Sequence, residues 1–206
     1  MKVENQTQRR LDIEMAALAV LAERGYRRTS MLQIARRAKA SNETLYAWYG
    51  SKEKLFADII ESNGRKVREY LEQALVKSAD PLNSLEALGP ILLNFTASDK
   101  AIIVNRAAVA DAAETGLLAQ AIDESARGAL YPLVCSLMSA IEQSGHFKLD
   151  GGVEDAADCY LSLLFGETQF RQALGRVSPL SSSQINQRAK RAFELTQRLF
   201  SGHANP

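Results

Sequence analysis

Residues 30–56, SMLQIARRAKASNETLYAWYGSKEKLF, constrain the fold of this chain more than any other stretch. Ser30, Ser41 and Ser51 each have the residue type and position of a helix N-cap, and Gln33 completes a capping box with Ser30. The pattern predicts two short helices joined by a turn of about three residues, followed by the capped start of a third helix. Such a pair is typical of a helix-turn-helix, whose second helix enters the major groove of DNA.

Charge is distributed unevenly along the chain. The net charge is +1, but residues 1–54 carry eleven Lys or Arg and six Asp or Glu, whereas residues 55–206 carry fourteen and eighteen. The first part therefore has a net charge of +5 and the rest has −4. A basic head suggests a polyanionic partner, although charge alone fits a solvated charged face equally well.

The first predicted helix runs from Arg9 to about Arg24 and ends at Gly25, a residue favoured at helix C-termini. We expect residues 1–8 to be frayed. An apolar stripe at helical spacing is predicted to face the core. Its members are Leu11, Met15, Leu18, Ala19 and Ala22.

Helical periodicity continues after the helix-turn-helix, and no segment alternates convincingly at period two. A helix of more than about 20 residues is predicted from Lys52, and Asp80-Pro81 then stops it and starts the next helix. The other predicted helices cover residues 82–97 with a kink at Gly89-Pro90, 99–113, 117–144 as one or two helices, 153–174 and 184–200. We therefore predict an all-α fold of about nine helices. It comprises a three-helix DNA-binding domain at 1–54 and a larger helical ligand-binding and dimerisation domain at 55–206.

The last two predicted helices, 153–174 and 184–200, carry more apolar surface than the others. A helix that is apolar on more than one side is buried. We expect this pair to form a four-helix bundle with a second copy of the chain, which gives a two-fold homodimer. Burial of the pair within a single chain is the alternative.

Six short sequence elements follow one another within residues 10–56. They are Gly25-Tyr26, Thr29-Ser30, Ile34-Ala35, Ala38-Lys39-Ala40-Ser41, Thr44-Leu45-Tyr46-Ala47-Trp48-Tyr49 and Ser51-Lys52-Glu53-Lys54-Leu55-Phe56. Their order and spacing resemble the DNA-binding domain of the TetR family of transcriptional regulators. Lys39 stands where that family usually has Gly, so we expect it to adopt the left-handed conformation at a small cost.

This resemblance implies a DNA-binding transcriptional regulator. More specifically, it implies a repressor that binds a palindromic operator as a dimer and is released by a small molecule in the C-terminal domain. A TetR-like activator or ligand-independent DNA binder is one alternative. A helical enzyme or protein-interaction module is another.

The candidate DNA contacts centre on the second helix of the motif. Asn42, Glu43 and Thr44 occupy its first turn, where Asn pairs with adenine and Glu accepts from cytosine, although Glu43 also fits as a favourable charge at a helix N-terminus. The resemblance implies that Tyr46 and Trp48 face DNA, and helix N-termini beside Thr29 and Lys52 favour phosphate. The full set is Thr29, Arg36, Lys39, Ser41, Asn42, Glu43, Thr44, Tyr46, Trp48 and Lys52.

The resemblance also implies a small-molecule effector, whose identity the sequence does not disclose. Interhelical clefts are where helical domains hold ligands. Candidates are residues that bring aromatic or polar character into otherwise apolar segments, although each fits the core or the surface as well. They are Asn94, Phe95, Arg106, Phe165, Gln169 and Phe170.

Motifs for catalysis are absent from the sequence: it contains no GxGxxG, GxxxxGK[ST], HExxH or GxSxG. Cys135 and Cys159 have no CxxC partner and are interpreted as buried free thiols, and the two histidines are His146 and His203. We expect no catalytic residue, no metal and no cofactor. No apolar run approaches the roughly 20 residues that span a bilayer, and the N-terminus lacks a signal core, so we expect a cytoplasmic protein.

Overall fold

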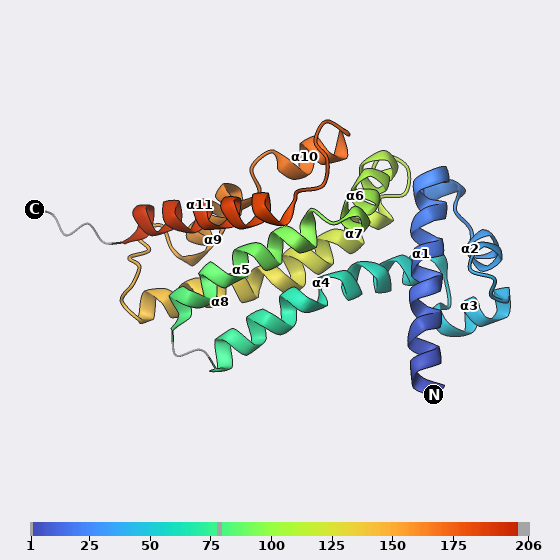
Figure 1. The fold of residues 1–206 in the computed structure, drawn as a ribbon, viewed down its shortest axis with the longest axis horizontal. Coiled ribbons are helices and arrows are strands. Elements are labelled where there is room, and N and C mark those ends of the chain that lie inside the picture. The colour runs from blue at the N-terminus through green and yellow to red at the C-terminus, as the bar shows by residue number, and fades with distance from the viewer. Residues whose placement is uncertain (1, 78–79, 202–206) are drawn as a thin grey trace, which may run out of the picture. The chain divides into compact units, whose positions relative to one another are not determined.

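The computed structural model describes residues 2–77 and 80–201, and these form helices, turns and loops without a β-strand (Figure 1). The predicted all-α class is confirmed. In chain order the elements are α1 (Lys2–Arg28), α2 (Met31–Arg37), α3 (Asn42–Tyr49), α4 (Lys52–Lys77), α5 (Pro81–Thr96), α6 (Asp99–Asp111), α7 (Leu117–Asp123), the π-helix η1 (Glu124–Leu130), α8 (Tyr131–Gln143), α9 (Val153–Phe165), α10 (Thr168–Ala173) and α11 (Ser182–Phe200). His203 lies outside the described residues.

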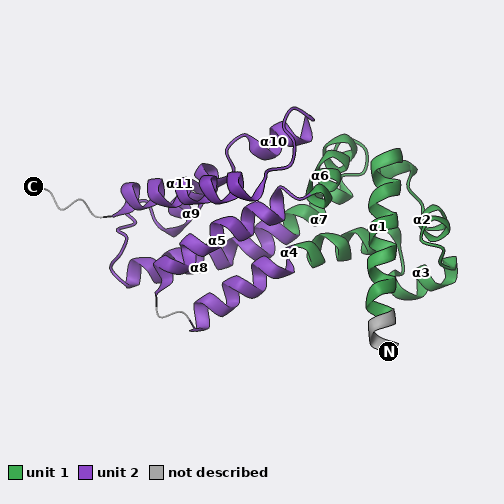
Figure 2. Cartoon of the chain, viewed as in Figure 1, with its two compact units in different colours: residues 1–63, 99–124 green, residues 64–98, 125–206 purple. Residues whose placement is uncertain are grey.

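The chain divides into two compact units (Figure 2). Unit 1 contains the described residues up to Asn63 together with Asp99–Glu124, and unit 2 contains Gly64–Ser98 and the described residues from Ser125 onward. The division falls within α4, which continues through Gly64 as predicted. These units are defined by packing alone. The boundary between residues 54 and 55 was predicted to separate a DNA-binding domain from a ligand-binding and dimerisation domain, and it stays a prediction.

Helix α1 packs against α2 and α6 in unit 1 through a stripe that differs from the predicted one. The buried residues of α1 up to Leu21 are Ile13, Ala16, Ala17, Leu18, Val20 and Leu21. Leu11 is 44% exposed, Met15 is 57% exposed and Ala22 is also exposed, so their assignment to the core is wrong, whereas Leu18 is buried as predicted. Both stripes have helical spacing, and only the neighbouring helices decide which one is buried.

The ends of α1 also differ in part from the prediction. The helix begins at Lys2 rather than at Arg9, so the described residues before Arg9 are helical. Gly25 adopts φ 72° and ψ 169°, which ends the regular helix there as predicted, and a short helical segment continues to Arg28.

Unit 2 is a bundle in which α11 packs on α5 and α9, and α8 packs on α5 and α9 (Figure 1). Its core includes Leu85, Leu88, Leu137 and Tyr160, all fully buried. The Tyr160 hydroxyl donates to the Leu85 carbonyl at 3.2 Å, which satisfies the one polar group of a large core side chain. A Cβ on Gly89 would lie 3.0 Å from the Ala189 Cβ, so the missing side chain lets α5 approach α11 closely.

Helix α5 starts at Asp80-Pro81, as predicted. The Asp80 side chain accepts from the Leu82 backbone N–H at 2.9 Å, and Pro81 occupies the first turn, where its missing N–H costs nothing. The helix then runs on through Gly89 and Pro90.

Two predicted helices are divided in the structure. Residues predicted as one or two helices over 117–144 form α7, η1 and α8 in succession. The helix predicted over 153–174 ends at Phe165, because Gly166 adopts φ 44° and ψ −134°, and α10 follows as a separate short helix. That backbone conformation is open almost only to glycine.

Gly166→Ala is expected to lower the free energy of unfolding by about 1–2 kcal/mol, because the new residue would occupy a glycine-only conformation. Its Cβ would also lie 2.5 Å from the Arg188 Nη2, in a side chain whose Nε donates to the Leu164 carbonyl. Urea denaturation of the variant measures this loss. The double variant Gly166→Ala/Arg188→Ala separates the backbone cost from the clash, and an unchanged unfolding midpoint for Gly166→Ala would contradict the assignment.

The described residues bear on three further expectations. No single helix among them is long and apolar enough to cross a membrane, whereas α5 and α6 pass that test of length and composition only when taken together. Cys135 and Cys159 are free, as predicted, but half-buried. No group of His, Cys, Asp and Glu side chains in this part of the chain has the arrangement of a metal site.

Candidate nucleic-acid interface

The turn between α2 and α3 is built from local hydrogen bonds. Ser30 and Gln33 form the predicted capping box at the start of α2, and Ser41 Oγ accepts from the Thr44 backbone N–H at 2.9 Å at the start of α3. Between the helices Lys39 adopts φ 51°, which confirms the predicted left-handed conformation. Its N–H donates to the Arg36 carbonyl, so the turn is closed without glycine.

Arg9 holds this turn from α1. Its guanidinium donates one N–H to the Ala38 carbonyl at 3.1 Å and another to the Lys39 carbonyl. These carbonyls follow the end of α2, where a positive charge is favourable. Sequence reasoning assigned Arg9 only to the start of a helix. The signal that could have found this role is a cation on α1 placed opposite a turn rich in unpaired carbonyls.

Helix α3 presents one apolar and one polar face. Leu45 is fully buried and fixes the helix on the core of unit 1. Asn42 and Glu43 are exposed, Tyr46 is 51% exposed, and Thr44 is half-buried with its hydroxyl 2.7 Å from Ser41 Oγ. The N-terminal half of the helix therefore offers amide, carboxylate and phenol groups to a partner.

Trp48 lies at the edge of this face. It is half-buried against the core of unit 1, and the Arg10 guanidinium carbon lies 5.8 Å from the ring centroid. A cation over an indole ring contributes about 0.5–1 kcal/mol at an exposed site. Trp48 therefore has a structural role beside the DNA contact that the resemblance implies.

Lys52 is anchored at the first turn of α4. Its Nζ donates to the Tyr26 carbonyl at 3.0 Å and lies 4.1 Å from the centroid of the Tyr26 ring. Ser51 caps the same turn by accepting from the Lys54 N–H at 3.2 Å, as predicted. An ammonium group has three N–H donors, so this anchoring leaves donors for a phosphate.

Thr29 is placed differently from its predicted role. The residue is 3% exposed, and its hydroxyl donates to the Gly25 carbonyl at 2.8 Å. Its backbone N–H donates to the Tyr26 carbonyl at 3.2 Å. Because both donors are used inside the fold, the structure argues against a phosphate contact by Thr29, whose side chain instead closes the end of α1.

The Arg and Lys side chains around the turn between α2 and α3 fall into two groups. Arg36 and Lys39 are exposed beside the turn. Arg37 pairs with Glu23 at 2.6 Å, and Arg27 pairs with Glu114 at 3.2 Å. Surface pairs of this kind are weak, about 0–1 kcal/mol, so they orient the side chains without removing their charge from the face.

The six candidate effector residues are divided between the two units. Arg106 is an exposed residue of α6 in unit 1, whereas the others belong to unit 2. In unit 2, Asn94 and Phe170 are exposed, and the Asn94 amide donates to the Pro90 carbonyl. Phe95, Phe165 and Gln169 are half-buried. Within unit 2, these three are therefore the candidates that are partly shielded from solvent.

Comparison with protein families decides the class of this chain. The model for bacterial regulatory proteins of the tetR family matches residues 14–59, and the model for the AefR-like transcriptional repressor C-terminal domain matches residues 83–200. The chain belongs to the TetR family. The family and the fold are those of transcriptional regulators rather than enzymes.

Solved structures show the same fold over nearly the whole of this TetR-family chain. A TetR-family regulator from Mesorhizobium loti MAFF303099 is 21% identical, covers 95% of this chain and 98% of its own, and has a TM-score of 0.74. SmeT in complex with triclosan is 18% identical, with coverage of 96% and 93% and a TM-score of 0.76. FadR from Bacillus subtilis in complex with stearoyl-CoA is 20% identical, with coverage of 90% and 96% and a TM-score of 0.66. None of the curated proteins compared with this chain matches it.

Proposed function

We propose that this TetR-family regulator is a repressor that binds a palindromic operator as a dimer and is released when a small molecule binds its C-terminal domain. The observation that carries the proposal is the polar face of α3, where Asn42, Glu43 and Tyr46 are exposed while Leu45 is buried. The match of residues 83–200 to a repressor C-terminal domain supports the repressor assignment. We further propose that the protein is cytoplasmic and has no enzymatic activity.

In this proposal the residues divide into those that read bases and those that hold the backbone. Asn42 and Glu43 reach base edges, because they lie at the N-terminal end of the recognition helix. Tyr46 and Trp48 contact the adjoining bases or sugars. Arg36, Lys39 and Lys52 supply positive charge to phosphates, and Ser41 and Thr44 complete the contacts at the start of α3.

The dimer is proposed to form through α9 and α11, which pack against each other in unit 2. One side of this pair is used within the chain, where Tyr160 and Phe193 are buried. Leu163 is half-buried and Leu199 is 60% exposed, so apolar surface is left for a second copy. A two-fold dimer places two recognition helices about 34–36 Å apart, which matches successive major grooves.

The effector is proposed to bind in the helical domain at residues 55–206, with the half-buried Phe95, Phe165 and Gln169 as the strongest candidates for its lining. Two proteins of the same fold, SmeT and FadR, hold triclosan and stearoyl-CoA, which supports small-molecule binding without naming a ligand here. Release from DNA follows if the ligand binds the low-affinity conformation more tightly.

Selection of duplex DNA from a random pool, followed by gel-shift titration at several salt concentrations, tests the proposal. We expect a palindromic site bound by a dimer, with affinity that falls steeply as salt is raised. Lys52→Met and Arg36→Met are each expected to reduce the slope of log K against log salt by about 0.9, the value for one lost phosphate contact. Lys148→Met, which removes an exposed cation from the loop between α8 and α9, is the matched control and should leave the slope unchanged.

Two outcomes would contradict this function. The absence of salt-sensitive duplex binding would favour an interaction module, and an asymmetric site bound by a monomer would remove the dimer. A reporter gene behind the selected site distinguishes repression from activation, because repression predicts lower transcription when the protein is present.

A further inference from the structure

Two buried oxygen atoms in unit 1 have no hydrogen-bond partner among the described residues: the Tyr26 hydroxyl and Asp111 Oδ1. Tyr26 is 3% exposed and Asp111 is 4% exposed. The other Asp111 carboxylate oxygen accepts from the Thr115 hydroxyl, so only one half of that carboxylate is satisfied. A buried polar group without a partner costs about 1–3 kcal/mol, and a bound water or ion is one way in which folded proteins satisfy such a group.

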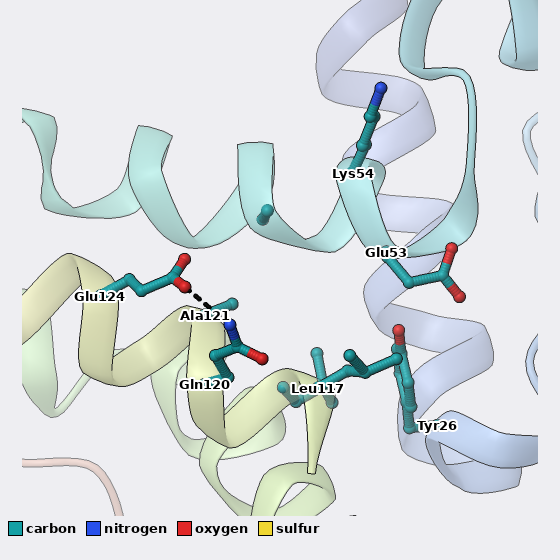
Figure 3. Close-up of a pocket in the computed structure, with 9 residues that line it drawn as sticks. Tyr26, Glu53, Lys54, Leu117, Gln120, Ala121 and Glu124 are labelled. Atoms are coloured by element: carbon teal, nitrogen blue, oxygen red, sulfur yellow. Dashed lines mark hydrogen bonds between the residues drawn. The ribbon is translucent and has the colours of Figure 1, made fainter. Parts of the chain in front are cut away.

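The Tyr26 side chain lines a groove of about 190 Å³ in unit 1 (Figure 3). The groove is formed with the first turns of α4 and with α7, and in Figure 3 the Tyr26 hydroxyl is directed toward Glu53. Its other lining residues are Glu53, Lys54, Ala57, Leu117, Leu118, Gln120, Ala121 and Glu124. The volume is below the roughly 300–1,000 Å³ of drug-sized sites, so a molecule of only a few carbons fits.

The charges around the groove favour a cation. The lining contains two carboxylates, Glu53 and Glu124, and one ammonium group, Lys54, and Glu124 accepts from the Gln120 amide at 2.8 Å. Lys52 donates to the Tyr26 carbonyl but keeps its positive charge, and its Nζ lies 4.1 Å from the centroid of the Tyr26 ring. The Asp111 carboxylate also acts on the Tyr26 hydroxyl, so three carboxylates stand against two ammonium groups. The pKa of Glu53 is lowered by hydrogen bonds from its own backbone N–H and from Ser51, so this carboxylate is ionised at neutral pH.

The Tyr26 hydroxyl also suits a positively charged donor. Burial, together with the carboxylates of Glu53 and Asp111, raises the pKa of Tyr26 to about 12, so the phenol stays neutral and its oxygen can accept a hydrogen bond. The apolar side chains of Ala57, Leu117 and Ala121 can cover a short alkyl body.

We propose that this groove binds a small primary alkylammonium ion, whose charged head donates to the Tyr26 hydroxyl beside the Glu53 carboxylate and whose alkyl chain lies against Leu117 and Ala57. The site lies in unit 1 and is distinct from the effector site proposed around Phe95, Phe165 and Gln169. It does not depend on whether the protein represses transcription.

Ligand-observed NMR on the full chain, with n-butylammonium chloride as the probe at constant ionic strength, tests the site. We expect saturable binding with a Kd in the millimolar range, about −4 kcal/mol, and binding of 1-butanol about tenfold weaker because it lacks the charge. Tyr26→Phe and Glu53→Gln should each weaken butylammonium binding by about fivefold, the effect of one hydrogen bond or close charge. Tyr70→Phe is the matched control, because the Tyr70 hydroxyl donates to the Ser84 carbonyl in unit 2.

The proposal is overturned if butylammonium shows no saturable binding up to about 100 mM, which would leave a buried water as the partner of Tyr26. It is equally overturned if 1-butanol binds as tightly as butylammonium, or if Tyr26→Phe and Glu53→Gln bind it like the wild type. Should Tyr26→Phe fail to fold, Glu53→Gln decides alone, because Glu53 is exposed and its replacement leaves the core intact.

Discussion

Tyr46→Ala is expected to lower the affinity for the selected operator by about tenfold to a hundredfold, which corresponds to 1–3 kcal/mol for a residue in direct contact with DNA. Tyr46 is half-exposed on α3 and its ring is not part of the buried core of unit 1. The loss should therefore appear in gel-shift titrations without a change in the midpoint of thermal unfolding.

Val109→Ala is the control for this variant, because Val109 is also an exposed apolar residue of unit 1 but lies on α6. Its operator affinity should equal that of the wild type. If Tyr46→Ala and Val109→Ala bind equally well, α3 does not read DNA through Tyr46. If Tyr46→Ala also unfolds earlier, its lower affinity reports stability rather than contact.

Gly89→Ala is expected to destabilise the protein by about 2–3 kcal/mol through overpacking. The new Cβ would lie 3.0 Å from the Ala189 Cβ and 3.2 Å from the Tyr160 hydroxyl oxygen. Ala189 has no flexible side chain that could move aside, so α5 and α11 would have to separate. Chemical denaturation measures the loss as a lower midpoint at an unchanged slope.

Gly64→Ala is the matched comparison, since Gly64 is also a buried glycine inside a helix. Its Cβ would meet Ser125 Oγ at 3.5 Å and the Leu130 Cδ1 at 3.7 Å, which are ordinary contacts. We expect this variant to be more stable by about 0.5–1 kcal/mol, because alanine loses less backbone entropy in a helix. A loss of similar size for both variants would show that close approach is not the role of Gly89.

The sequence predicted those features that depend on neighbouring residues. The caps at Ser30, Ser41 and Asp80 and the left-handed Lys39 were all predicted correctly, because each depends on hydrogen bonds or backbone angles within a few residues. The family could be predicted for the same reason, since its pattern lies in one continuous stretch.

Features that depend on distant residues were not predictable. The apolar stripe of α1 was assigned to Leu11 and Met15 because two stripes share the same spacing, and the position of α6 decides between them. The burial of Thr29 is an exception, because its hydroxyl bonds the Gly25 carbonyl only four residues away and was still not predicted. The candidate effector residues came from composition alone, and composition does not say which helices meet.

The guanidinium of Arg9 has a consequence for shortened versions of the gene. The family match begins at residue 14, so a fragment cut to that match keeps the whole helix-turn-helix and appears sufficient by alignment. Such a fragment would lose the donor that holds the Ala38 and Lys39 carbonyls in place. The smallest fragment that keeps the turn between α2 and α3 rigid therefore includes Arg9 and the residues before it, which a family alignment would discard.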